Sequence, residues 1–181
     1  MPADAVLLFE DETVLRLFPL LRRAWGLRGE SLRIGITGRN AKRVLFGALN
    51  PLTGHRLLLQ APNMKQLHFQ SFLRLLRRAY RERPLWLLLD EAPWHIAPRR
   101  QALARQLNIE FLWLPKHCSE LNAMDQLWRE RKGSLSANYQ YSTIAAHGAF
   151  AQAWLLSLTD TEAKRKAGTL SKNFWLHSFF K

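Results

Sequence analysis

Three short acidic segments contain most of the chemistry that the sequence offers. Asp11 lies in LLFEDE, Asp90 in LWLLLDEAPWH and Asp125 in SELNAMDQLW. The first two aspartates follow apolar runs, and the third lies on a predicted helix that comes after another apolar run. A carboxylate at the end of a buried strand is costly unless it is paired or binds a cation. Together the three segments predict a metal site.

The metal that such a site prefers is a hard divalent cation. Converging carboxylates repel one another, and Mg²⁺ or Mn²⁺ relieves that repulsion because hard cations prefer oxygen ligands. Two ions roughly 3.5–4 Å apart can activate a water or a 3′-hydroxyl and stabilise the leaving oxygen of a phosphoryl displacement. The carboxylates must be ionised for this, so activity should fall at low pH. Paired carboxylates could instead hydrolyse glycosides, but no aromatic pattern typical of sugar binding accompanies them.

The charge of the chain points to a polyanionic partner. Lys and Arg number 27 against 14 Asp and Glu, which gives a formal charge of +13 and a pI near 10.9. Such an excess favours nucleic acid, or else an anionic surface. Cys118 is the single cysteine, which excludes an intrachain disulfide and a zinc finger and fits a reducing compartment. We see neither a signal peptide nor a membrane-length apolar run, and we expect a cytoplasmic protein without a membrane partner.

The hydrophobic pattern predicts the elements that must position these residues. An antiparallel meander comes first, and strands separated by helices follow. Such strands become parallel neighbours through right-handed crossovers, so we expect a mixed sheet with helices on both faces. The predicted strands are Ala5–Phe9, Leu32–Thr37, Arg43–Leu49, His55–Gln60, Leu85–Leu89 and Ile109–Leu114. The predicted helices are Gln66–Arg83, Arg99–Leu107, Glu120–Ser136 with Ser119 as its N-cap, Ile144–Leu158 and, within the tail Thr159–Lys181, a short one that carries Lys164, Arg165 and Lys166.

This order of elements can bring the three aspartates together. Sites in open α/β sheets gather at the carboxyl ends of strands, where Asp90 lies, and Asp11 lies beside it if the two strands are neighbours. At 100° per residue, Asp125 falls about 40° from Leu121, at the edge of an apolar helical stripe. That stripe consists of Leu121, Met124, Trp128 and Leu135. A surface ion pair between Asp125 and Arg129 at i,i+4, worth about 0.3–0.5 kcal/mol, is the competing interpretation.

These segments resemble the catalytic core of DDE transposases of the Tc–mariner type, especially their bacterial insertion-sequence relatives. In that family a "DE" closes the first strand, a "DNA…H" follows a second apolar strand, and "LPPYSPELNPIE..W..LK" leads into the last catalytic helix. LPKHCSELNAMDQLWRERK is similar to that last block. The 34 residues between Asp90 and Asp125 match the separation typical of the superfamily. The resemblance runs from about Val6 to Lys132.

The resemblance implies a fold and an activity. The fold would be α/β and RNase H-like (retroviral integrase-like), a mixed five-stranded sheet flanked by helices. One catalytic domain would cover residues 1–181, with no N-terminal helix-turn-helix domain present. The activity would be metal-dependent DNA strand cleavage and strand transfer at transposon ends. Asp11, Asp90 and Asp125 would be catalytic and would bind Mg²⁺ or Mn²⁺, with two ions expected and Glu12 as an additional candidate ligand.

Other positions match the family less directly. Trp25 stands where the family often has a tryptophan, and Trp128 matches the tryptophan of the catalytic helix. His95 matches the family's histidine, and we expect a structural hydrogen bond or a DNA contact from it, not metal ligation. The expected DNA contacts are Arg129, Arg131, Lys132, His95, Arg99 and Arg100. The basic face of the Gln66–Arg83 helix is either a second DNA surface or a solvated face.

Several departures from the family pattern keep alternatives open. The third acid is Asp125 where Glu is commoner, Glu91 replaces an asparagine, and Ala123 replaces a proline. A non-catalytic DNA-binding remnant of a transposase is therefore one alternative, and a nuclease of the same fold without strand transfer is another. The expected partners are the DNA of transposon ends and target, a second copy in an active homodimer, and a separate helix-turn-helix subunit.

Overall fold

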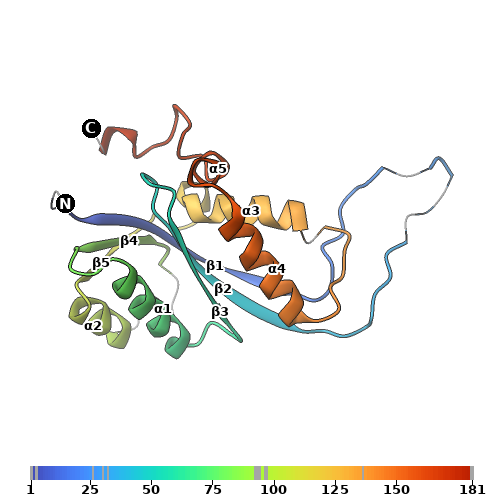
Figure 1. Cartoon of the computed structure of the whole chain (residues 1–181), viewed down its shortest axis with the longest axis horizontal. Helices are drawn as coiled ribbons and strands as arrows, with labels where there is room; N and C mark the ends of the chain where they lie inside the picture. The colour runs from blue at the N-terminus through green and yellow to red at the C-terminus, as the bar shows by residue number, and fades with distance from the viewer. Residues whose placement is uncertain are drawn as a thin grey trace.

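The structure is a computed structural model that describes residues 2, 4–25, 27–29, 31, 33–91, 95, 98–135 and 137–179. Within these residues five strands form one mixed sheet in the order β3-β2-β1-β4-β5 (Figure 1). β1, β2 and β3 are antiparallel, whereas β4 and β5 run parallel to β1. The strands are β1 Val6–Arg16, β2 Lys42–Leu49, β3 Arg56–Ala61, β4 Leu85–Leu89 and β5 Ile109–Trp113. The predicted mixed five-stranded sheet is confirmed.

One predicted strand is wrong. We expected a strand at Leu32–Thr37, but residues 33–37 form none, and Leu32 lies outside the described residues. β1 instead continues to Arg16 and pairs with β2 from Phe9 onward, while β3 takes the other edge of β2. The sheet forms without this segment, which lies in the connection between β1 and β2.

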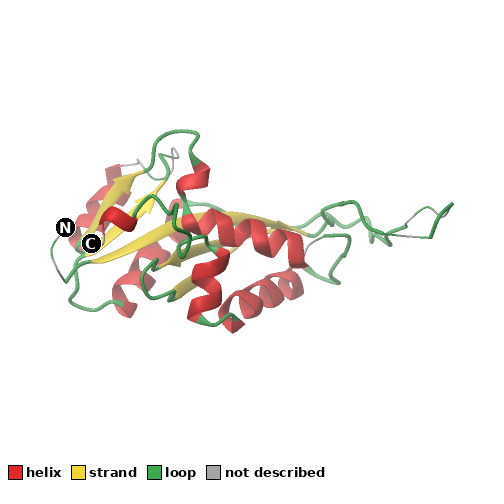
Figure 2. Ribbon diagram, turned by 90° about the horizontal axis from the view of Figure 1, so that it is seen from above, coloured by secondary structure: helices red, strands yellow, loops and turns green. Residues whose placement is uncertain are grey.

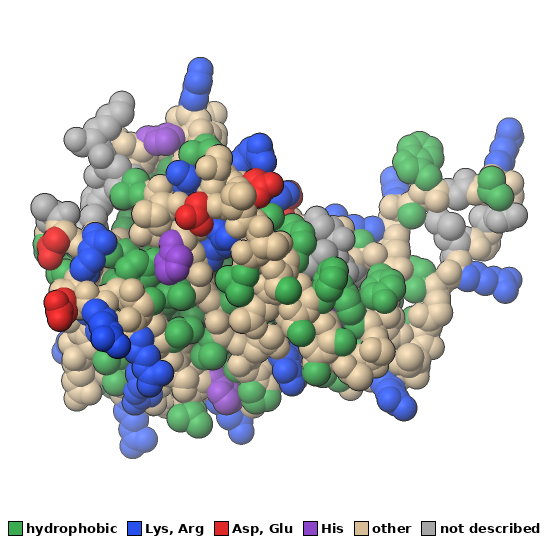
Figure 3. All heavy atoms as spheres, viewed as in Figure 1, with side chains coloured by type: hydrophobic (Ala, Val, Ile, Leu, Met, Phe, Trp, Pro, Cys, Tyr) green, Lys and Arg blue, Asp and Glu red, His purple; other side chains and the backbone are tan. Residues whose placement is uncertain are grey.

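The connection between β1 and β2, residues 17–41, projects far from the sheet as an arm (Figure 1). Trp25 is 101% exposed at this arm, and Leu21 and Leu27 exceed 70%. Figure 3 shows apolar and basic side chains together on the projection. The base is tied to the body, because Arg22 N donates to Asn138 Oδ1 at 2.8 Å and Thr37 N to Gln140 Oε1 at 2.6 Å.

Helices cover both faces of the sheet, as predicted (Figure 2). Side chains alternate along β1, so Leu7 and Phe9 face one hydrophobic cluster while Val6 and Leu8 face the other. α1 and α2 cover the Leu8 side, and α3 and α4 cover the Phe9 side, where α5 packs against α3. The helices are α1 Gln66–Ala79, α2 Pro98–Gln106, α3 Ala123–Leu135, α4 Ile144–Ser157 and α5 Asp160–Lys166, with 3₁₀ turns at Ser119–Leu121 and His177–Phe179.

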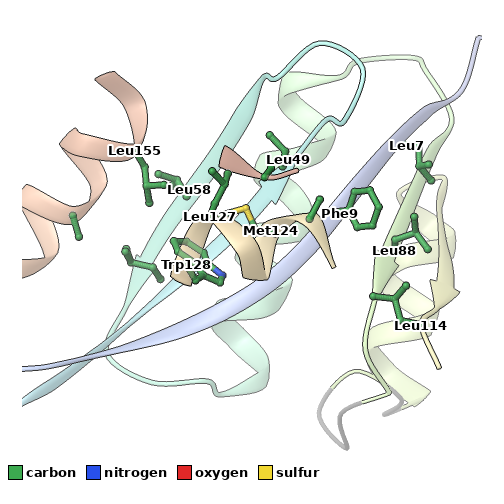
Figure 4. Packing of buried hydrophobic residues seen from close by; sticks show 14 of the residues in the cluster. Leu7, Phe9, Leu49, Leu58, Leu88, Leu114, Met124, Leu127, Trp128 and Leu155 are labelled. Carbon is green, nitrogen blue, oxygen red and sulfur yellow. The ribbon is translucent and has the colours of Figure 1, made fainter. Parts of the chain in front are cut away.

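α3 packs through the apolar stripe that the sequence predicts. Met124, Leu127 and Trp128 are fully buried against the sheet (Figure 4). Burying each such side chain contributes about 1.5–3 kcal/mol, which holds the helix firmly on β1 and β2. Leu121 is half-buried at the edge of the stripe. The side chain of Leu135 lies outside the described part of the chain.

The start of α3 differs from the prediction. We expected Ser119 to cap a helix over Glu120–Ser136, but Ser119 begins a separate 3₁₀ turn. Asn122 caps α3 instead, because its Oδ1 accepts a hydrogen bond from Met124 N at 3.0 Å. The Asn122 side chain also donates to the Glu10 carbonyl at 2.8 Å. This bond to β1 fixes the helix start, which no local sequence pattern could reveal.

The two C-terminal helices lie close to their predicted positions. α4 begins at Ile144 as expected, and the Thr143 side chain accepts from Ala146 N at its start. α5 begins with a capping box between Thr159 and Glu162. Within the described ranges, no helix combines the length and the apolar character that crossing a bilayer requires.

Candidate active site

The parallel pairing of β1 and β4 aligns the first two aspartates. Phe9 pairs with Leu88 in the register. Asp11 and Asp90 each lie two residues further along their chains. Because side chains alternate with period two, Asp11 leaves β1 on the face of Phe9, which is the α3 side of the sheet. The expectation that the two segments are neighbours is therefore met.

A glycine lets α3 come close enough to add the third aspartate. Gly47 on β2 pairs with Asp11. A Cβ at Gly47 would lie 2.4 Å from Met124 Cε and 2.6 Å from Trp128 Cζ2, which real structures do not tolerate. The helix thus rests directly on the backbone of β2. Asp125, in its first turn, is held beside the end of the β1–β4 pair.

The three aspartates line one cavity of about 390 Å³. The side chain of Asp90 is 61% exposed and that of Asp125 is 19% exposed, whereas Asp11 is half-buried. The structure therefore brings together the three residues that the sequence predicted as a triad. The remaining lining residues are Glu91, Leu114, Pro115, Lys116, His117, Cys118, Ser119 and Asn122.

The electrostatics of the cavity favour a cation. Burial raises the pKa of Asp11 well above its ordinary value, and the charges of Glu12, Asp125 and Asp90 raise it further. A divalent cation would remove this penalty. Every acidic ligand offered by the triad is a carboxylate oxygen, which is what Mg²⁺ and Mn²⁺ prefer. Glu91 adds another acid at the rim, where Lys116 Nζ lies 3.5 Å from its Oε2.

Asp125 also makes the ion pair that competed with its role in the triad. Arg129 Nη2 lies 2.8 Å from Asp125 Oδ2, and the same nitrogen donates to Ser119 Oγ at 3.1 Å. The N–H does not point at Oδ2, and within the described residues this buried oxygen accepts no hydrogen bond. The pairing is thus one of charge alone. Both interpretations of Asp125 are compatible, since the carboxylate lines the cavity and contacts Arg129.

The structure does not bring Glu12 to the triad. Glu12 follows Asp11 on β1 and points to the opposite face, because neighbouring strand residues alternate. Its Oε1 lies 3.1 Å from His95 Nε2, and it is absent from the lining of the triad cavity. Glu12 therefore does not belong to the cavity of the triad, and its role as a metal ligand stays a prediction. Glu12 is adjacent to Asp11 in the sequence, but the two side chains lie on opposite faces of the sheet.

His95 lies beneath the triad, not at the surface. Its Nδ1 is 2.9 Å from Asp90 Oδ1, and its ring is 1% exposed. Burial alone would lower the pKa of His95, but the hydrogen bonds with Asp90 and Glu12 outweigh it and raise the pKa to about 11. This position fits the structural hydrogen bond that we expected and excludes a direct DNA contact.

The predicted DNA contacts divide into accessible and buried residues. Arg99 is exposed, Arg129 has 54% of its side chain exposed, and Lys132 is half-buried. Arg131 and Arg100 are only 1% and 4% exposed, so they cannot reach a phosphate from where they lie. Burial lowers the pKa of Arg131 to about 10. These two arginines were expected on the DNA surface because a helix sequence shows charge but not which neighbour covers it.

Three residues that shape the site were missed. Gly47 sits in the apolar strand RVLFGAL, and a glycine inside a strand signals close backbone approach. Asn122 precedes the helix that it caps, and such a residue is a common N-cap. Glu10 is completely buried on the His95 side of the sheet. Nothing in the sequence signals that a carboxylate inside LLFEDE would be enclosed.

Comparison with known proteins places these features in a family. Residues 6–146 match the family described as DDE superfamily endonuclease. An insertion element IS630 uncharacterized 39 kDa protein of Shigella sonnei is 26% identical over 144 residues, 78% of this chain. Those residues are 42% of the relative, so the chain spans less than half of that protein's length.

Solved structures of the Mos1 transposase share the fold. Its paired-end complex with the left transposon end superimposes with a TM-score of 0.70 at 19% identity over 93% of this chain and 53% of that one. The paired-end complexes with Mg and with Mn give TM-scores of 0.70 and 0.69 at 20% and 19% identity, over 91% of this chain and 52% of those. The RNase H-like fold is thereby confirmed. With the family match covering most of its length, the chain belongs to the DDE superfamily endonucleases.

Proposed function

We propose that this chain is the catalytic domain of a transposase, which cleaves DNA at transposon ends and joins the freed 3′-hydroxyl to target DNA. The observation that carries the proposal is the cavity in which Asp11, Asp90 and Asp125 meet. The family match and the fold shared with a transposase bound to a transposon end support it. The chain spans about half the length of those proteins, and recognition of the DNA ends is proposed to involve a further module.

The three aspartates are proposed to hold two Mg²⁺ or Mn²⁺ ions. When bound, such ions supply an activated oxygen nucleophile and stabilise the leaving oxygen. The fit rests on the hard carboxylate donors, on the raised pKa of Asp11 and on the buried Asp125 oxygen that accepts no hydrogen bond from the described residues. Complexes of the Mos1 transposase with Mg and with Mn are consistent with these metals.

The protein's own residues set the geometry of the site. α3 is fixed to β2 by its contact at Gly47 and to β1 by Asn122, so we propose that Asp11 and Asp125 keep their separation when DNA enters. Such rigidity keeps the reacting groups aligned, which is worth a large part of the rate. Arg99, Arg129 and Lys132 are the accessible cations that we propose to contact the DNA backbone.

The active assembly is proposed to be a homodimer. The arm of residues 17–41 carries Leu21, Trp25, Leu27 and Ile36, each more than half exposed. Exposed apolar side chains on a projecting segment favour a protein contact. We propose that a separate helix-turn-helix subunit recognises the DNA ends. The proposed location of the protein is the bacterial nucleoid.

A plasmid nicking assay tests the catalytic proposal. Supercoiled plasmid is incubated with the wild type and with Asp90→Asn, each with Mg²⁺, with Mn²⁺ or with EDTA. We expect metal-dependent nicking by the wild type and none by Asp90→Asn. Equal nicking by both proteins would refute the assignment. Adding a labelled duplex with a free 3′-hydroxyl then separates strand transfer, which transfers label to the plasmid, from hydrolysis by a nuclease of the same fold.

One observation favours a second candidate, a non-catalytic DNA-binding protein. The Arg129 guanidinium already lies against Asp125, so the third carboxylate has a counter-charge without metal. This candidate predicts that the wild type binds plasmid DNA but does not nick it under any metal condition. The same assay, followed by gel shift, decides between the two.

A further inference from the structure

His95 joins the two faces of the sheet. On one side its Nδ1 lies 2.9 Å from Asp90 Oδ1 and 3.0 Å from the Asp90 carbonyl oxygen. On the other side its Nε2 lies 3.1 Å from Glu12 Oε1 and 3.7 Å from Glu10 Oε2. A single imidazole ring thus connects a member of the triad to two carboxylates that the triad itself does not reach.

The surroundings of the ring are closed. His95 is 1% exposed, the side chain of Glu12 4% and that of Glu10 0%. The Phe69 ring packs on the imidazole with centroids 4.9 Å apart, and Arg100 lies 5.5 Å from the centroid of Phe69. No donor in the described residues reaches either carboxylate oxygen of Glu10 in hydrogen-bond geometry. The imidazole ring is the group for which the structure shows short contacts with both glutamates.

The partners of the ring determine what it can do. Asp90 and Glu12, when ionised, are acceptors only, so each ring nitrogen must donate. Asp90 is the most exposed of the triad carboxylates whose exposure is given above, and an exposed side chain loses rotamer entropy when it binds an ion. A hydrogen bond that holds it in advance removes part of that cost. Outer partners of this kind typically change metal affinity tenfold to a hundredfold.

We propose that His95 is a positioning residue, which Glu12 and Glu10 hold from the far face of the sheet so that its Nδ1–H fixes the Asp90 carboxylate for metal binding. The inference rests on the proposed metal site and deepens it. It also gives the two buried glutamates a purpose, since they act on the site through the ring and not as ligands. His95 itself touches neither metal nor DNA.

Two amide substitutions separate the contacts of the ring. Asn places its amide nitrogen near the position of Nδ1, and Gln places its own near Nε2. His95→Asn therefore keeps the donor to Asp90, while His95→Gln keeps only the donor to Glu12. Mn²⁺ binding to the full chain without DNA is measured by electron paramagnetic resonance of the free ion, with Asp90→Asn as the reference for a lost ligand.

We expect His95→Asn to bind Mn²⁺ within about threefold of the wild type and His95→Gln to bind at least about tenfold more weakly. Both variants bury an amide in place of a ring, so a merely structural role would lower their thermal stability alike and leave their Mn²⁺ affinities equal. Equal affinities would overturn the inference. If neither the wild type nor Asp90→Asn binds Mn²⁺, the proposed metal site itself is refuted. That result is distinct from equal affinities of the two His95 variants, which would refute the positioning role alone.

A measurement on the wild type guards against variants that do not fold. In ¹⁵N-labelled protein, both ring nitrogens of His95 should be protonated. Their resonances are assigned as those missing from the spectrum of whichever variant folds, His95→Asn or His95→Gln. Titration with Mg²⁺ should shift the Nδ1 resonance more than the Nε2 resonance, because only Nδ1 contacts Asp90. A ring whose resonances do not move while Mg²⁺ binds would overturn the positioning role.

Discussion

Asp11 pairs with Gly47 across the β1–β2 ladder, and α3 rests on that glycine with Met124 and Trp128. The first carboxylate of the triad is thus directly opposite the point where the helix of the third touches the sheet. Asp125 lies one residue after Met124. The distance between the carboxylates of Asp11 and Asp125 therefore depends on position 47 being a glycine, which has no side chain.

Replacing Gly47 with alanine should damage both stability and metal binding. The new Cβ would lie 2.4 Å from Met124 Cε and 2.6 Å from Trp128 Cζ2, so α3 must shift. Overpacking of this kind costs about 1–3 kcal/mol of unfolding free energy. Because Asp125 moves with α3, Mn²⁺ should also bind more weakly. Urea unfolding and Mn²⁺ titration of Gly47→Ala measure the two effects.

Gly133→Ala is the matched control for that substitution. Gly133 lies in α3, and the nearest atom to its added Cβ is Arg22 Nη1 at 3.6 Å, an ordinary contact. Alanine inside a helix is favoured over glycine by about 0.5–1 kcal/mol. We expect a slightly more stable protein with unchanged Mn²⁺ affinity. If Gly47→Ala behaved in the same way, α3 would not be resting on β2 as described.

Arg56 should be a stability residue without a role in the site. It is 8% exposed, and its guanidinium donates to Leu155 O at 2.9 Å, to Gly54 O at 2.8 Å and to Leu158 O. Arg56→Met leaves these carbonyls without their donor, and each buried unsatisfied group costs about 1–3 kcal/mol. We expect a loss of about 2–4 kcal/mol in urea unfolding, with Mn²⁺ affinity unchanged.

Substitution of Asp160 tests the ion pair of Arg56 separately from the hydrogen bonds that Arg56 donates to carbonyls. Its Oδ1 lies 3.2 Å from Arg56 Nη1, but its side chain is 61% exposed. Exposed ion pairs contribute about 0–1 kcal/mol, so Asp160→Asn should cost little. A loss as large as that of Arg56→Met would show that the ion pair, and not the carbonyl contacts, holds β3 to the end of α4.

The sequence predicted the triad because each aspartate interrupts or follows an apolar run, a pattern visible in one dimension. Glu10 and Glu12 belong to the same run, but their contacts with His95, which comes from a distant part of the chain, are not visible in the sequence. The alternation of apolar residues predicts a strand at Leu32–Thr37, but alternation alone does not show whether a segment reaches the edge of a sheet. Asn122 and Ser119 are both plausible caps, and the bond from Asn122 to Glu10 selects between them.

His147 should make stability depend on pH. It is 3% exposed, its Nδ1 donates to Arg16 O at 3.2 Å, and it stacks on Tyr141 with centroids 4.4 Å apart. Burial lowers the pKa of His147, and the charge of Arg131 lowers it further. As pH falls through about 6.5, the unfolded chain takes up a proton that the native state refuses. The contribution of His147 is therefore present above that pH and lost below it.

His147→Phe isolates this effect, because phenylalanine keeps a flat ring against Tyr141 but does not titrate. At pH 7.5 the variant should be about 1 kcal/mol less stable, owing to the lost hydrogen bond to Arg16 O. The difference between wild type and variant should shrink as pH falls toward 5, as measured by urea unfolding at each pH. A difference that stays constant or grows on acidification would show that His147 protonates freely in the native state.

Arg129 should affect metal and DNA in opposite directions. Its Nη2 lies 2.8 Å from Asp125 Oδ2. A metal ion that binds the triad must therefore displace the Arg129 guanidinium from this carboxylate or share the carboxylate with it. Arg129→Ala removes the competitor, and we expect Mn²⁺ to bind a few-fold more tightly to the protein alone. The same variant loses the phosphate contact proposed for Arg129, so its affinity for a DNA duplex should fall and the salt dependence of binding should weaken by about one ion.

Arg129→Gln serves as the partner variant, since it removes the charge while keeping a side chain that can still donate to Ser119 Oγ. If charge is what matters, Arg129→Gln should follow Arg129→Ala in both measurements. Metal affinity is measured by Mn²⁺ titration without DNA, and DNA affinity by fluorescence anisotropy over a range of salt concentrations. A variant that binds both Mn²⁺ and DNA more weakly would mean that Arg129 stabilises the conformation of the site. Its hydrogen bond to Ser119 Oγ would be the contact responsible.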